Sequence, residues 1–193
     1  PNGIMCQWVP LHRVPELHYK MIIRTFLNVF PHTTVWYKYT PDFVILIGTP
    51  EKLRINFRDF MARTQIPSIQ AGLRHDDLDG WSLLDSFIMG EEAARSYVGE
   101  GLVHTDNHPY LEFFGGREIV NTTYKNVSTM MPYREQVSSS LVNYGHTLEE
   151  KKQVRQTVGV YFSATQDLIR GHIAYAEGEL TKAAELMNQA VMQ

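Results

Sequence analysis

The sequence predicts an α/β fold in which a sheet near the N-terminus is followed by helices. Short apolar runs at 4–9, 33–39 and 43–48 have the length and composition of strands. An amphipathic segment separates the first two runs, and helical periodicity begins at residue 56. The chain has 193 residues, 44% of them hydrophobic, which suffices for one sizeable core or two small ones.

The first two elements are predicted to be a strand and a helix. Residues 1–3 read Pro-Asn-Gly, which is a turn signal, and the apolar run that follows ends at Pro10. Such a short, continuous run is typical of a strand buried on both faces. Pro15 fits the first turn of a helix that extends to Phe30. Its apolar face would be formed by Leu17, Met21, Ile22, Phe26, Leu27 and Phe30.

The next two strands, at 33–39 and 43–48, are separated by Thr40-Pro41-Asp42, which is typical of a turn. Because so short a connection cannot make a parallel crossover, we expect these strands to be antiparallel. The order strand, helix, strand, tight turn, strand is typical of the end of a Rossmann-like sheet of the methyltransferase type. The fold class predicted is therefore α/β, comprising the last strands and helix of such a sheet.

In the middle of the chain, short segments of helical apolar periodicity predict a cap of small helices, followed by a loop-rich stretch at 100–127. Gly80, Gly90 and Gly99 punctuate the later helical segments. The predicted segments are 56–64, 67–75, 81–89 and 91–98.

The last part of the chain predicts a helical hairpin. Thr147-Leu148-Glu149-Glu150 has the pattern of a capping box and opens a long helix. Its expected inward positions are Val154, Val158, Tyr161, Phe162, Leu168 and Ile169. The small residues Gly171, Gly178, Ala183 and Ala190 match the pattern of a tetratricopeptide repeat, although the large-residue positions fit less well. Ordinary close packing of two helices is the alternative explanation.

Composition argues against several classes of partner. The formal net charge is −3 and the basic residues are scattered, so nothing indicates binding to nucleic acid or to an anionic membrane. The longest apolar run, 43–47, is far shorter than the roughly 20 residues of a membrane-spanning helix. Cys6 is the single cysteine, which excludes a disulfide within the chain and favours a reducing compartment. Because it lies in an apolar run, we expect Cys6 to be packed.

Two separated blocks carry a resemblance to a known family. The first reads GIMCQWVPLH at 3–12, RTFLNVFPH at 24–32, VWY at 35–37 and FVILIGT at 43–49. The second reads HTDNHPYLEF at 104–113. Both resemble the spermidine synthase family of polyamine aminopropyltransferases, most closely its bacterial members that are often fused to membrane segments. The second block is similar to their Asn-Thr-Asp-Asp-x-Pro-x-Leu-Glu-Phe segment.

The resemblance implies three regions. Residues 1–115 would be the C-terminal half of a spermidine synthase-like domain, 116–146 a linker of loops and helices, and 147–193 a tetratricopeptide-like hairpin. The chain opens without Met and enters a strand at once, which predicts a start inside a domain. We expect a cytoplasmic protein or the cytoplasmic domain of a membrane-anchored parent.

The resemblance also implies a function for the parent protein. Family members transfer an aminopropyl group from decarboxylated S-adenosylmethionine, the co-substrate, to a polyamine such as putrescine. Gln7 matches the glutamine that they carry at the end of the fifth strand, and Tyr37 or Tyr39 would correspond to a tyrosine before the last strand; both positions face the amine. Asp106 and Glu112 would fix a structural loop. The family's Gly-rich loop and catalytic Asp precede this block, so no catalytic residue is implied and we expect the chain alone to be inactive.

Other interpretations of these residues remain open. Gln7 can be a strand-end side chain satisfied by the backbone, and either tyrosine can belong to the core. His104, Asp106 and His108 alternate as metal ligands do in an extended segment, but the adjacent Pro109 and the resemblance favour a loop-fixing Asp106 and predict no metal. The run at 75–80 lacks the ligand spacing of a calcium loop and predicts a solvated turn.

A function of a different class is an interaction module. One helical repeat cannot bury its own apolar face, so the tail predicts binding to a protein partner or to a second copy of the chain.

Overall fold

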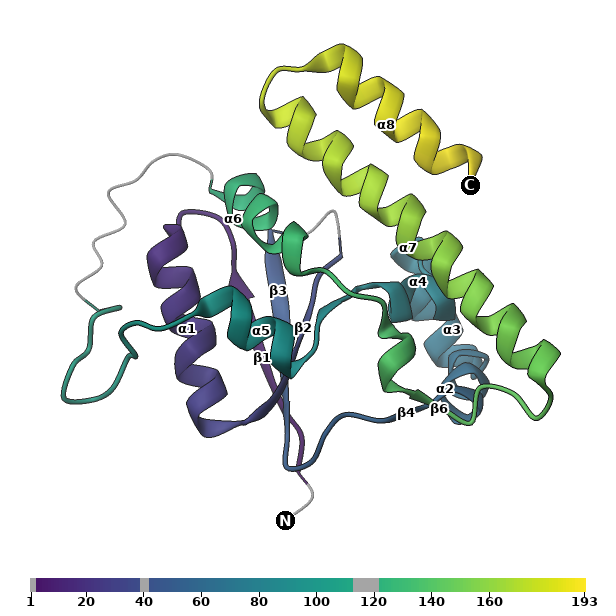
Figure 1. Cartoon of the computed structure of the whole chain (residues 1–193), viewed down its shortest axis with the longest axis horizontal. Helices are drawn as coiled ribbons and strands as arrows, with labels where there is room; N and C mark the ends of the chain where they lie inside the picture. The colour runs from purple at the N-terminus through teal and green to yellow at the C-terminus, as the bar shows by residue number, and fades with distance from the viewer. Residues whose placement is uncertain (1–2, 39–41, 113–121) are drawn as a thin grey trace.

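The structure, a computed structural model, describes residues 3–38, 42–112 and 122–193 (Figure 1). It is a mixed α/β fold with a small antiparallel sheet and a helical C-terminal part, so this level of the prediction is confirmed. The predicted turn at 40–42 falls largely outside the described residues, and Tyr39 lies wholly outside them. In the described ranges, no helix is long and apolar enough to cross a membrane.

The main sheet has four strands in the order β1-β3-β2-β5. Their bounds are Met5–Pro10 (β1), His32–Trp36 (β2), Phe43–Thr49 (β3) and Phe87–Met89 (β5). β3 is antiparallel to both β1 and β2, which confirms the predicted pairing of the second and third strands. β1 and β2 therefore run in the same direction, and helix α1 (Glu16–Val29) connects them. Their carboxyl ends lie at one edge of the sheet, where Pro10 pairs with Phe43 and Trp36 with Ile45.

One face of this sheet carries the larger core. Helices α1, α5 (Glu91–Val98) and α6 (Thr123–Met130) cover it (Figure 1). Alternate strand residues such as Val35, Val44 and Leu46 point into this core and are fully buried, as the two-residue period of a strand requires.

β1 is an edge strand, so the prediction that it is buried on both faces is wrong. Among the described strands it pairs only with β3, and residues 5–8 are exposed. Cys6 is exposed too, which corrects the expectation that it is packed. An apolar run reports hydrophobicity but carries no information on whether a second strand lies alongside.

The predicted helix at 81–89 is also partly wrong. Helix α4 (Gly80–Asp85) ends early, and Phe87–Met89 forms β5 beside β2. All three β5 residues are buried. A buried strand of consecutive apolar residues has no alternation, so its pattern is the same as that of a buried helical turn.

A second, smaller core lies beside the sheet. It contains Leu84, Phe87, Val137, Leu141 and Val158. Helix α2 (Phe57–Thr64) and a short parallel pair, β4 (Ile55–Asn56) with β6 (Leu141–Val142), pack around it, and helix α3 (Pro67–His75) follows α2. Two 3-10 turns, Met131–Tyr133 and Val137–Ser140, connect α6 to β6.

Asn126 of α6 fixes the loop that follows β1. Its side-chain amide donates to the carbonyl oxygens of Leu11, at 2.9 Å, and Val14, at 2.8 Å, and Asn126 is fully buried. The hydroxyl of Thr122 also donates to the carbonyl of Leu11, at 2.7 Å. The predicted linker region thus ties the connection between β1 and α1 to the core.

Replacing Asn126 by Ala is expected to lower the free energy of unfolding by about 2–3 kcal/mol, because the buried carbonyl of Leu11 and the half-buried carbonyl of Val14 each lose a donor. Urea denaturation followed by circular dichroism measures this change. Ser128→Ala is the matched control, since Ser128 is half-buried on the same helix and bonds only to the carbonyl of Lys125. Equal stability of the Asn126→Ala and Ser128→Ala variants would show that Asn126 does not hold the loop.

The C-terminal hairpin consists of α7 (Leu148–Ala176) and α8 (Leu180–Met192), which run antiparallel (Figure 1). The predicted capping box is confirmed: the Thr147 hydroxyl accepts from the Glu150 N–H, and the Glu150 carboxylate accepts from the Thr147 N–H, both at 3.1 Å. Of the predicted inward positions, Val158 and Ile169 are buried and the other four are half-buried.

The two helices approach each other closely at Gly171. A Cβ added there would lie 2.8 Å from Met187 Cγ and 3.3 Å from the carbonyl oxygen of Ala183. Replacing Gly171 by Val is therefore expected to lower the free energy of unfolding by about 1–3 kcal/mol through overpacking. Gly159→Ala on the same helix is the control, because the nearest atom to its Cβ would be 4.0 Å away. That substitution should stabilise by up to about 1 kcal/mol through helix propensity. Thermal unfolding of both variants gives the comparison, and a neutral Gly171→Val contradicts the close approach.

Candidate functional site

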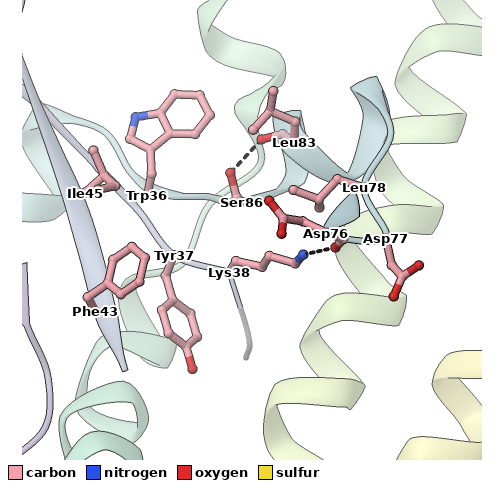
Figure 2. Close-up of a pocket in the computed structure, with 10 residues that line it drawn as sticks. All are labelled: Trp36, Tyr37, Lys38, Phe43, Ile45, Asp76, Asp77, Leu78, Leu83 and Ser86. Atoms are coloured by element: carbon pink, nitrogen blue, oxygen red, sulfur yellow. Dashed lines mark hydrogen bonds between the residues drawn. The ribbon is translucent and has the colours of Figure 1, made fainter. Parts of the chain in front are cut away.

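A cavity of about 620 Å³ lies at the sheet edge where β1 and β2 end (Figure 2). The sheet provides one wall, and the loop between α3 and α4 provides the other. Ligands of open α/β sheets commonly bind outside the carboxyl ends of parallel strands, and β1 and β2 run in the same direction, so this cavity is the candidate site. Its lining residues are Trp36, Tyr37, Lys38, Phe43, Ile45, Asp76, Asp77, Leu78, Leu83 and Ser86.

The wall formed by the sheet is apolar and aromatic. Trp36, Phe43 and Ile45 share the face opposite α1, because Trp36 pairs with Ile45 and Phe43 is two residues from it. The Trp36 indole N–H donates to the Thr34 hydroxyl at 2.8 Å, and its ring meets Phe87 edge-on, with the ring centroids 5.4 Å apart. These contacts fix the indole plane that borders the cavity.

The opposite wall is acidic. Asp76 caps the C-terminus of α3, and Asp77 follows it with a φ of 54°, a left-handed conformation that Asp tolerates better than most residues. Their carboxylates form no ion pair or hydrogen bond within the described residues. Figure 2 shows both side chains on this loop, with the Asp76 carboxylate on the side of Ser86.

The loop is anchored by Asp79, which is the N-cap of α4. Its carboxylate accepts from the Ser82 N–H at 2.7 Å and from the Tyr161 hydroxyl at 3.1 Å. Partial burial acts to raise the pKa of Asp79, but these hydrogen bonds outweigh burial and lower the pKa overall. Asp79 therefore stays ionised and holds Asp76 and Asp77 at the cavity.

Lys38 crosses the cavity from the end of the sheet to this loop (Figure 2). Its ammonium donates to the main-chain carbonyl of Asp76 at 2.5 Å. No carboxylate of the described residues lies within ion-pair distance of it. The lining of the cavity thus combines one cation and two carboxylates with the apolar wall formed by the sheet.

Tyr37 lines the cavity, but its ring belongs to the core on the α1 side. It is buried, and its main-chain N–H donates to the Ser86 carbonyl at 2.7 Å. Figure 2 shows the hydroxyl pointing away from Lys38 and the acidic loop. Burial, and secondarily the neighbouring Tyr124 and Asp42, raise the pKa of Tyr37, so the phenol stays protonated.

The other residues predicted to bind substrate do not join this cavity. Gln7 is exposed on β1, and its side-chain amide donates to the main-chain carbonyl of Trp8 at 2.8 Å. This is the alternative in which the backbone satisfies the Gln7 side chain. Gln7 is not among the residues that line the cavity. Tyr39 lies outside the described residues.

Asp106 and Glu112 lie in exposed turns. The turn at 105–108 is closed by main-chain bonds between Thr105 and His108 and by the Thr105 hydroxyl, which accepts from the His108 N–H at 3.2 Å. The ring of His104 accepts from the Leu111 N–H at 3.3 Å. Within the ranges the structure describes, no three His, Cys, Asp or Glu side chains gather as metal ligands do.

Sequence reasoning missed Lys38, Asp76 and Asp77 as site residues. The run at 75–80 predicts a solvated turn, which describes its backbone but not the residues that it faces. The acidic residues at 76, 77 and 79 were the only sequence feature that could have pointed to this wall of the cavity. Only the tertiary structure places it opposite Trp36, which lies 40 residues earlier.

Comparison of the chain with protein-family models, with curated proteins and with solved structures finds no match. The relationship to spermidine synthases therefore remains a prediction based on the two sequence blocks.

Proposed function

We propose that the chain is part of a spermidine synthase-like domain and that its cavity binds a polyamine. A polyamine is an aliphatic chain with ammonium groups, and it would need an apolar channel with carboxylates at its ends. One observation carries the proposal. The carboxylates of Asp76 and Asp77 lack a cationic partner among the described residues, and they lie beside the aromatic wall of Trp36 and Phe43. The ring faces add attraction for ammonium groups.

The strand arrangement supports the same proposal. The pairing of β3 between β1 and β2, antiparallel to both, is the arrangement expected where a Rossmann-like sheet of the methyltransferase type ends. In the reaction of the parent protein, a neutral amine nitrogen would attack the aminopropyl carbon of decarboxylated S-adenosylmethionine. The carbon–sulfur bond would break, the sulfonium would become a neutral thioether, and the amine would release a proton. The described residues would bind and orient the amine in this reaction.

Calorimetric titration of the chain with spermidine tests the proposal. We expect one site whose affinity falls as salt is raised, because the binding is between opposite charges. 1,8-Octanediol is the control ligand, since it has a similar length without charge and should not bind. Absence of heat with spermidine at low salt, or equal binding of the diol, would reject the polyamine site.

Protein association through the hairpin is a second candidate function. Tyr175 and Leu180, near the turn between α7 and α8, have exposed fractions of 62% and 63%. Exposed large apolar residues that lie together are typical of interaction sites. Light scattering over a dilution series tests this function: a concentration-dependent mass that Leu180→Glu abolishes supports association, and a constant monomer mass rejects self-association.

A further inference from the structure

Lys38 is itself a primary amine on a four-carbon chain, and it lies in the proposed amine site. Its ammonium reaches the Asp76 carbonyl at 2.5 Å, on the wall that carries both acidic side chains (Figure 2). In chemical terms this side chain is a tethered n-butylammonium, with the same spacing of methylenes as one arm of spermidine. The cavity thus already contains a group of the class that it is proposed to bind.

The position that Lys38 occupies is favourable for any ammonium group. Asp76 is the C-cap of α3, so its carbonyl lies at the negative end of a helix dipole. The carboxylates of Asp76 and Asp77 add negative charge to the same wall. Two ammonium groups cannot share this position, because their mutual repulsion would offset the gain.

We infer that Lys38 is an intrachain competitor that occupies the ammonium position of the cavity and is displaced when a polyamine binds. The inference rests on the proposed function. The ammonium of Lys38 is held by a carbonyl rather than by an ion pair, and its stem is only half-buried, so it can move into solvent. The apparent affinity for an external amine is reduced by the fraction of molecules in which Lys38 fills the position.

The test compares wild type with Lys38→Met and Lys38→Arg, using spermidine and n-butylammonium chloride as probes in calorimetry. Met keeps the length of the stem and removes the ammonium, so we expect Lys38→Met to bind both amines about tenfold more tightly. Arg keeps a cation on the same wall, so Lys38→Arg should bind no more tightly than wild type. Thermal unfolding of each variant confirms that the fold is retained.

Two of the possible outcomes separate the inference from the proposed function. If spermidine binds wild type and Lys38→Met equally, the polyamine site stands and the competitor role of Lys38 is overturned. If only n-butylammonium binds, and binds Lys38→Met more tightly, Lys38 competes but the site is not a polyamine site. If neither amine binds any of the three proteins, both ideas are rejected.

Discussion

Replacing Asp85 by Ala is expected to lower the free energy of unfolding by about 3–5 kcal/mol. Asp85, at the end of α4, pairs with Arg134, whose side chain is 0% exposed. One guanidinium nitrogen lies 3.1 Å and 3.2 Å from the two carboxylate oxygens of Asp85. Without Asp85, the guanidinium remains buried with no opposite charge.

Arg134 also connects this pair to the long helix. It donates to the carbonyl of Phe162 in α7 at 2.7 Å, and its guanidinium lies 4.0 Å from the centre of the Phe162 ring.

Urea denaturation at pH 7 measures the loss of stability on Asp85→Ala. Asp106→Ala, an exposed turn substitution that removes the same charge, should change stability by less than about 0.5 kcal/mol. A loss below 1 kcal/mol for Asp85→Ala would contradict this account of the pair.

The pair also predicts a pH dependence for Arg134→Met. Burial raises the pKa of Asp85 to about 6, against the opposing attraction of Arg134. A carboxyl in an unfolded chain titrates near pH 4, so the raised pKa of Asp85 adds stability that is fully present below about pH 4 and is lost as the pH rises through 6. This loss is the cost of ionising a buried carboxyl, and it is separate from the attraction to Arg134 that Asp85→Ala removes at pH 7. Removing Arg134 removes the attraction that limits this loss. The destabilisation by Arg134→Met, measured by urea denaturation, should therefore be larger at pH 8 than at pH 5. An equal or smaller destabilisation at pH 8 would disprove this pH dependence.

Replacing both Asp76 and Asp77 by Asn is expected to weaken spermidine binding at least tenfold. Each carboxylate would supply a charge-assisted hydrogen bond to an ammonium group, and Asn keeps the shape while removing the charge. Asn also tolerates the left-handed backbone at position 77, so the loop should keep its conformation. Calorimetry at low salt measures the change.

The control for this double variant is Asp106→Asn combined with Glu112→Gln. It changes the net charge by the same amount, at exposed turns that do not line the cavity. Spermidine should bind this control as it binds wild type. Equal weakening in both double variants would mean that spermidine responds to overall charge rather than to the acidic loop.

The sequence predicts those elements whose signals are local. The helix after Pro15, the antiparallel strands and the Thr147 capping box depend on nearby residues, and the structure contains all three. The exposure of β1 and the strand at Phe87–Met89 depend on which strands are neighbours, and an apolar run does not encode this.

The same reason explains why the candidate site was only partly predicted. The resemblance predicts Tyr37 as a site residue. Tyr37 does line the cavity, but its ring packs in the core. Lys38 and the acidic loop come together only because β5 returns the chain to β2, where the Tyr37 N–H bonds to Ser86. A contact across so many residues has no local signature.

The most direct test of the polyamine site uses the indole N–H signals of the three tryptophans in a proton–nitrogen correlation spectrum. Trp36 lines the cavity, whereas Trp81 lies between Phe57 and Tyr161, in a different pocket. Titration with spermidine is expected to shift the Trp36 signal progressively to saturation and to leave the Trp81 signal in place. A saturating shift of Trp81 with Trp36 unchanged, or no shift of either signal, would contradict binding in this cavity.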